Sequence, residues 1–131
     1  MPAPKIPVRK RYYETRLRNL NQWNVPASEL DHVRQFVDDL ARGKVNRGKQ
    51  LNERTCAKYL ELLRRPFEFF GKPIDQVELT DVESFDRSLS TGIILSRRGQ
   101  PYSQFSKADI RMALQVYFRW RLGAVQADHL A

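Results

Sequence analysis

Residues 51–73, LNERTCAKYLELLRRPFEFFGKP, carry a helical periodicity that has both a start and a stop signal. Apolar side chains recur there at intervals of three and four residues, which predicts a helix over 52–70. Gly71 marks the end, because glycine readily adopts the left-handed conformation that closes helices. Pro66 lies inside this helix and has no N–H to donate to the Leu62 carbonyl, so a kink or a break is expected there.

Three further helices are expected on either side of this segment. Ser28 and Asp31 resemble a capping box in front of an apolar stripe, and they predict the start of the first clear helix. Thr80 and Glu83 give the same signal for a short third helix. Residues 103–122 carry the last helix, with apolar residues at helical spacing. The predicted fold class is therefore an all-α bundle of four helices.

The remaining segments are expected to be an arm and a tail. Residues 1–27 are predicted to be a flexible basic N-terminal arm that contains a short helix, since three prolines and three bases fall within the first ten residues. Trp23 is expected at the surface, where it staples the arm to the domain or meets another subunit. The domain itself is expected to occupy 28–123, with a frayed tail at 124–131. Residues 93–101 are expected to form a connector, in which Ile93, Ile94 and Leu95 either pack or add a strand.

Composition places the chain among single-domain proteins that bind polyanions. It has 131 residues and a formal net charge of +8, and the bases are concentrated in 1–20, 42–54 and 91–123. Such segregation is expected when some elements face phosphate and others face away. One cysteine, Cys56, forms no intramolecular disulfide and is interpreted as a small core residue. We expect a cytosolic protein, without a membrane segment, a metal or another cofactor.

Three motifs in this order resemble a known family. The first runs from the polar cap at 51–55 through Tyr59 to the glycine turn at 71–73. The second is the acidic start of a short helix at 77–85, and the third is the aromatic closing helix at 102–120. Together they are similar to the N-terminal core-binding domain of tyrosine recombinases, the phage integrase family. Pro66 and the long connector before residue 102 depart from the family pattern.

The resemblance implies a SAM-like orthogonal four-helix bundle that packs against duplex DNA as one half of a clamp. The family's catalytic residues belong to a downstream domain, so this chain is expected to be no enzyme by itself. It is expected to act as the DNA-binding domain of an integrase at a recombination site, in DNA integration or site-specific recombination. Its expected partners are double-stranded DNA and other recombinase subunits of the parent protein, with no small-molecule ligand.

Candidate DNA contacts are the bases and amides at two helix starts and in two loops, where they can neutralise phosphates. The helix candidates are Asn52, Arg54, Lys58, Gln104, Lys107 and Arg111, and the loop candidates are Lys44, Arg47, Lys49, Arg97 and Arg98. The alternative for these bases is an ordinary solvated surface, and for Asn52 a helix cap. The aromatic residues are expected in the core. Two other functions stay open: a helical module that binds an acidic protein, and a free-standing dimeric DNA-binding regulator.

Overall fold

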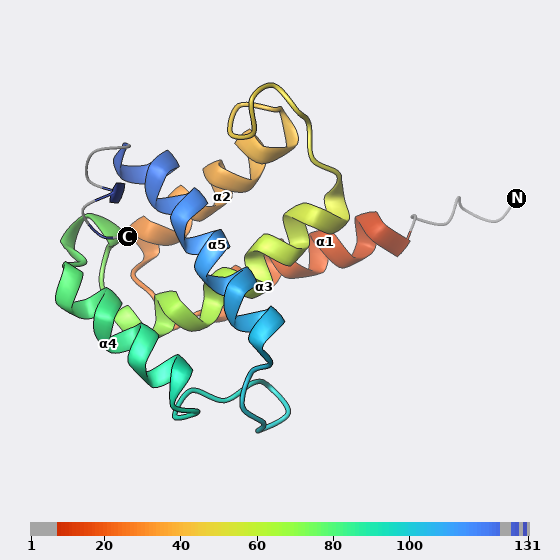
Figure 1. Cartoon of the computed structure of the whole chain (residues 1–131). Helices are drawn as coiled ribbons and strands as arrows, with labels where there is room; N and C mark the ends of the chain where they lie inside the picture. The colour runs from red at the N-terminus through yellow and green to blue at the C-terminus, as the bar shows by residue number, and fades with distance from the viewer. Residues whose placement is uncertain (1–7, 124–126, 129, 131) are drawn as a thin grey trace, which may run out of the picture.

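A computed structural model describes residues 8–123, 127, 128 and 130, which form five packed α-helices and no strand (Figure 1). The all-α prediction is confirmed, and the predicted number of four helices is wrong. The fifth helix is α1, which agrees with the short helix expected within the N-terminal arm but packs against the bundle. The elements are α1 Val8–Arg18, η1 Asn19–Gln22, α2 Ala27–Ala41, α3 Glu53–Phe70, η2 Ile74–Gln76, α4 Leu79–Ser90 and α5 Gln104–Leu122.

Helix α3 is the central element, and its predicted boundaries are confirmed within a residue. The Asn52 side-chain carbonyl accepts the Thr55 backbone N–H at 2.9 Å, which caps the first turn. Gly71 closes the last turn with a φ of 64°. The break expected at Pro66 is absent, because the helix continues through it to Phe70. Pro66 is buried, so packing offsets the lost backbone hydrogen bond.

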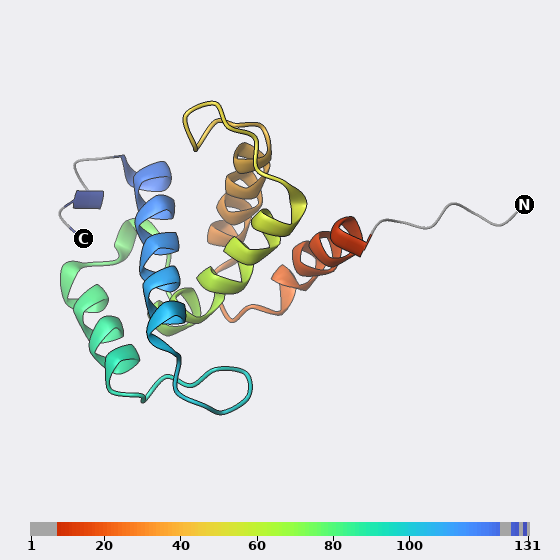
Figure 2. The ribbon, with the colours of Figure 1, turned by 45° about the vertical axis from the view of Figure 1, so that its right-hand side comes forward.

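Helix α1 lies beside α3 and runs in roughly the same direction, and α2, which connects them in the sequence, packs on the other side of α3 (Figures 1 and 2). Tyr13 and Leu17 of α1 pack against the core, and polar contacts add to this junction. Arg16 Nη2 lies 2.6 Å from Glu61 Oε1, and the Tyr12 hydroxyl donates to the same carboxylate. Beyond η1, the Asn24 backbone N–H donates to Glu68 Oε2 at 3.0 Å. The folded unit therefore extends back to α1, since this helix is held by α3.

Trp23 is buried, contrary to the expectation of an exposed indole. Its exposed fraction is 7%, and its ring meets Phe67 edge-on with the centroids 6.3 Å apart. It lies just after η1, where it covers the second half of α3. The first of the two predicted alternatives, stapling of the N-terminal segment to the domain, matches this position.

Both predicted capping boxes are misplaced. Helix α2 starts after Pro26, whose φ of −54° suits a helix entry, and the Asp31 carboxylate bonds Arg34 instead of the helix start. Helix α4 starts after Glu78, whose backbone N–H donates to Asp81 Oδ2 at 2.9 Å. Lys72 hydrogen-bonds the Asp81 carboxylate as well and lowers the pKa of that group.

The connector after α4 forms a turn instead of a strand. Leu95 and Pro101 make an isolated bridge, and the Ser96 backbone N–H donates to the Gln100 carbonyl at 2.8 Å. The Gly99 N–H donates back to Ser96 at 2.9 Å, which tightens the loop. A single bridge between two residues is too short to support a strand, so the connector projects from the bundle as a compact loop.

The core is aromatic, as expected. Tyr117 of α5 lies between Phe36 of α2 and Phe67 of α3, with ring centroids 4.9 and 4.8 Å away. Phe85 and Leu89 bring α4 into the same core. Edge-on ring contacts of this kind add to the stabilisation from burial. Three helices therefore meet around one tyrosine ring.

A carboxylate is buried in this core without any exposed surface. Glu29 of α2 accepts the Ile74 backbone N–H at 2.9 Å, and the Tyr117 hydroxyl donates to its other oxygen. Arg121 Nε lies 3.3 Å from the same carboxylate and neutralises it. Burial and the Glu29 charge together raise the pKa of the Tyr117 phenol far above its ordinary value.

Part of the predicted tail is also packed. Ala127 and Leu130 are buried against the core, with exposed fractions of 2% and 5%. Arg119 Nη2 of α5 lies 3.1 Å from Asp128 Oδ1. The expectation of a frayed tail is therefore wrong at these positions, since apolar side chains there find an apolar surface.

We predict that Glu29→Ala destabilises the fold by about 3–5 kcal/mol, because it leaves Arg121 and the Ile74 N–H unpaired inside the protein. Tyr117→Phe keeps the ring and loses one bond to a charged group, at a cost of about 1.5–3 kcal/mol. Urea unfolding followed by circular dichroism measures both values. Exposed Glu83→Ala is the control, and an equal loss in this variant contradicts the prediction.

We also predict that Cys56 is unreactive in the folded protein. It is fully buried, and burial together with the nearby Glu53 charge raises its pKa to about 11. At pH 8 roughly one thiol in a thousand is then ionised, and only the thiolate reacts. Labelling with a disulfide reagent at pH 8 is expected to be slow in buffer and fast in urea. Equal rates in the two conditions contradict the assignment of Cys56 to the core.

Candidate nucleic-acid interface

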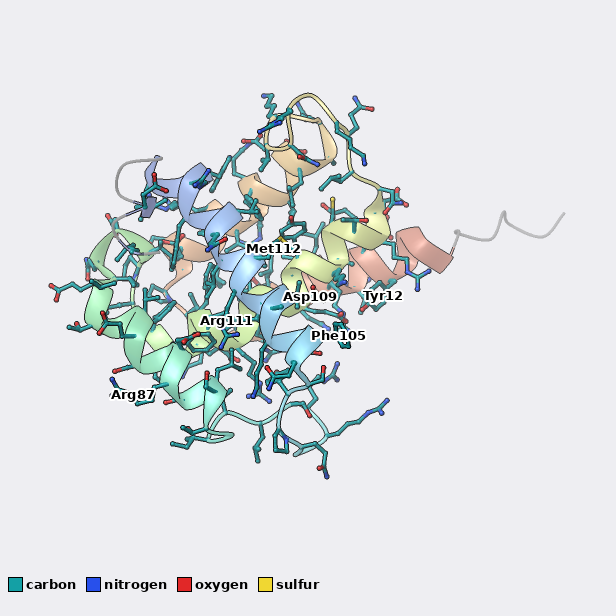
Figure 3. All side chains as sticks on the ribbon, in the orientation of Figure 1. Tyr12, Arg87, Phe105, Asp109, Arg111 and Met112 are labelled. Carbon is teal, nitrogen blue, oxygen red and sulfur yellow. The ribbon has the colours of Figure 1, made fainter. Side chains whose placement is uncertain are left out.

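Two of the predicted helix-face contacts are turned toward α4. Lys107 is 8% exposed, and its ammonium lies 3.5 Å from the Ser90 carbonyl. Arg111 Nε donates to Asp86 Oδ1 at 2.7 Å, and its Nη2 donates to the Ser90 hydroxyl at 3.0 Å. Figure 3 shows Arg111 on the α4 side of α5. Both bases therefore join α5 to α4, and neither presents a free cation to solvent.

Lys58 of α3 lies on the opposite side of α5 from these two bases. Lys58 Nζ of α3 is 3.4 Å from Asp109 Oδ2, and Figure 3 shows Asp109 on the side of α5 that faces α1 and α3. Arg54 and Gln104 are exposed, and Asn52 is exposed while its amide caps α3. Helix α5 thus separates the predicted bases into two groups, and the single patch expected from the two helix starts does not form.

The loop between α2 and α3 presents three bases outward. It folds back on itself, because the Gly48 N–H donates to the Gly43 carbonyl at 3.0 Å. A side chain at Gly43 would place its Cβ 2.7 Å from the Gly48 carbonyl oxygen, so glycine is required there. Lys44, Arg47 and Lys49 are all exposed, and no ion pair within the described part of the chain uses them.

The connector between α4 and α5 carries a second exposed basic group. Arg97 and Arg98 lie at the tip of its turn, between Ser96 and Gly99. Neither guanidinium takes part in an ion pair with any described carboxylate. These two loops therefore supply five cations that remain available to an external anion.

A groove of about 600 Å³ lies between η1, α3, the connector and the start of α5. It contains Arg97 and Arg98 together with three arginines that were not among the predicted contacts, Arg16, Arg64 and Arg65. Two of those three are neutralised, Arg16 by Glu61 and Arg64 by Glu68, at 2.6 and 3.3 Å. Arg65 is exposed and has no ion pair to a described carboxylate. The sequence signal for this site is the Arg64-Arg65 pair on the central helix.

Negative charge gathers elsewhere. Asp75, Glu78 and Glu83 are exposed around η2 and the first turn of α4, and none has an ion pair among the described residues. Figures 1 and 2 both place this end of α4 away from α1. The free cations of the two loops and of α3 therefore lie apart from this acidic group, and Arg87 of α4 is a further exposed cation without an ion pair to a described carboxylate.

No protein-family model, curated protein or solved structure matches this chain. The likeness to tyrosine recombinases therefore depends on the sequence motifs at 51–73, 77–85 and 102–120. Within the described part of the chain, no helix has the length and apolar character needed to cross a membrane. The same residues contain no cluster of histidine, cysteine and acidic side chains that fits a metal ion.

We predict that Arg111 and Asp86 are energetically coupled. Their pair is about half exposed, so a double-mutant cycle with Arg111→Ala and Asp86→Ala is expected to give a coupling of about 0.2–1 kcal/mol. Urea unfolding at low and high salt measures it, and salt should weaken it. Additive effects of the two substitutions would show that the contact of Arg111 with Asp86 of α4 contributes no coupling energy.

Proposed function

We propose that this chain is a non-enzymatic module that binds double-stranded DNA, mainly through phosphates. The observation that supports the proposal is the distribution of free cations. Lys44, Arg47 and Lys49 project from one loop and Arg97 and Arg98 from another, whereas three exposed acids without ion pairs, Asp75, Glu78 and Glu83, lie around the start of α4. A surface divided in this way attracts a polyanion to one side and repels it from the other.

Phosphate binding is favourable because each neutralised phosphate releases condensed counterions. Arg54 of α3 joins the five loop cations, which gives six free bases in or near the two loops. If all six reach phosphates, the logarithm of the binding constant falls with the logarithm of salt concentration with a slope of about −5. Gln104 is exposed at the start of α5, where its amide suits an adenine edge.

The sequence motifs extend this proposal to a family. We infer that the chain is the core-binding domain of an integrase, a tyrosine recombinase, and that it holds the duplex at a recombination site for DNA integration or site-specific recombination. The capped start of α3 and the α5 helix that crosses it correspond to the first and third of those motifs. The chemistry would belong to another domain of the parent protein.

A second candidate is a module that binds a protein. Phe105 is 86% exposed and Met112 is 41% exposed on the outward side of α5, where Figure 3 shows them. An exposed apolar face of this kind favours a protein contact. An exposed aromatic patch around Trp23 and Phe69 would favour this candidate further, but Trp23 is buried and only Phe69 is exposed, at 43%. Self-association in sedimentation experiments that is lost in Phe105→Ser would favour this candidate if no duplex is bound, and a dimeric DNA-binding regulator if duplex binding is retained.

We predict that the loop bases control duplex affinity. Fluorescence anisotropy with a labelled blunt duplex, measured across a salt series, is expected to give a steep slope. Arg97→Ala/Arg98→Ala and Arg47→Ala/Lys49→Ala should each reduce the magnitude of that slope by about 2, since each removes two phosphate contacts.

The control is Arg87→Ala/Arg119→Ala, which removes two exposed cations from α4 and from the far end of α5. Lys107→Ala/Arg111→Ala should lower the stability and leave the salt slope unchanged, since those bases join α5 to α4. The proposal fails if the wild-type protein does not bind any duplex at low salt, or if all four double variants change the slope equally.

A further inference from the structure

The groove beside α3 has the size of a small-molecule site and an unusual charge. Its volume of about 600 Å³ lies within the range of about 300–1,000 Å³ that ligand sites occupy. Five arginines and two glutamates line it, which leaves a formal charge of +3. Arg65, Arg97 and Arg98 account for that excess, because none of them pairs with a described carboxylate. The walls therefore favour an anion.

Arg16 adds a further donor at the groove. Its Nη2 pairs with Glu61, while its Nε is buried and has no hydrogen-bond partner. A buried N–H of a charged group without an acceptor is costly, so a ligand acceptor or a bridging water is favoured beside it. This donor lies on the α1 wall, and the three free guanidinium groups come from α3 and the connector.

The groove also has an apolar and aromatic lining. Leu60, Leu62 and Ile110 line it, together with the half-buried ring of Tyr102 at the entry to α5. Leu60 and Ile110 are already buried, whereas a bare phosphate ion would satisfy the guanidinium groups and leave the half-buried side chains of Leu62 and Tyr102 in contact with water. A nucleotide satisfies both, because its phosphate meets arginine and its base packs on aromatic and apolar surface.

Continuity with the proposed DNA surface decides between a free nucleotide and a strand. Arg97 and Arg98 belong both to the basic connector and to the groove. A strand that leaves a duplex held by the connector would therefore meet the groove directly. An acidic peptide lacks flat bases for Tyr102 and has no such continuity, so nucleic acid fits the lining better.

We propose that this groove binds an unpaired DNA strand adjoining the duplex, with its phosphodiesters on Arg65, Arg97 and Arg98 and one base against Tyr102. The proposal rests on duplex binding and adds a second, single-stranded contact.

The test compares one labelled duplex in three forms: blunt, with a ten-nucleotide thymidine overhang, and with an overhang of abasic sites. Stacking of a single base makes the thymidine overhang bind about tenfold more tightly than the blunt duplex. The abasic overhang should lose most of this gain. Arg65→Ala and Tyr102→Leu should each reduce the gain and leave blunt-duplex affinity nearly unchanged, whereas Arg87→Ala should retain it. Arg65 is exposed, so its variant is expected to fold, and thermal unfolding checks this.

Equal affinity for the blunt and overhung duplexes would overturn the groove proposal and leave duplex binding intact. An abasic overhang that binds as tightly as thymidine would also overturn it, because the groove would then recognise phosphate alone. The groove proposal would also be overturned if millimolar inorganic phosphate competed completely with the overhang. The same conclusion would follow if a polyglutamate peptide competed as effectively as the free thymidine strand. Absence of binding to any duplex would instead contradict the function proposed above.

Discussion

The buried Glu29 carboxylate is the interaction on which the rest of the bundle depends. It joins the start of α2 to the Ile74 backbone and to Tyr117 and Arg121 of α5. A carboxylate removed from water is tolerated only when its charge and its lone pairs are matched, so these three segments must assemble together. Tyr117 then carries the constraint to α3 through its ring contact with Phe67. The path of α5 across α3, and with it the position of the connector, follows from this arrangement.

Apolar periodicity predicted α3 and α5 well. The spacing of their apolar residues reflects a buried helix face, and this spacing does not depend on how the rest of the chain folds. The caps of α2 and α4 were misplaced, since several residues near each start carry suitable side chains and only the backbone path selects one. Helix α1 was predicted only as a short helix within an arm. Arg16 and Tyr12 attach it to Glu61 of α3, and polar contacts of this kind leave no apolar periodicity in the sequence. The position of Glu29 was not predicted for a related reason, as a single acid among surface-like neighbours in the sequence does not reveal burial.

The residues of the candidate site also fall into those whose positions were predictable from the sequence and those whose positions were not. The positions of Arg47 and Arg97 were predictable because glycine-rich turns with many charges cannot be buried. The positions of Lys107 and Arg111 were not, since the helical spacing gives the face of a residue and not the identity of the helix packed against it. The groove that contains Arg65 could not be predicted from the sequence at all. Its walls come from segments about thirty and more residues apart, and only the folded chain brings them together.

Because α1 forms part of the groove, docking of α1 on α3 and binding of a ligand in the groove are linked equilibria. Arg16, Asn19 and Trp23 supply one wall, so the groove is complete only while α1 and η1 are docked on α3. A ligand that touches this wall binds the docked state more tightly than the undocked state, and it therefore shifts the population toward docking. By thermodynamic linkage, whatever strengthens docking of α1 also increases affinity in the groove, until the docked state is fully populated. The N-terminal helix thus acts as an adjustable affinity element, and sequence changes that never meet the ligand can tune binding through it.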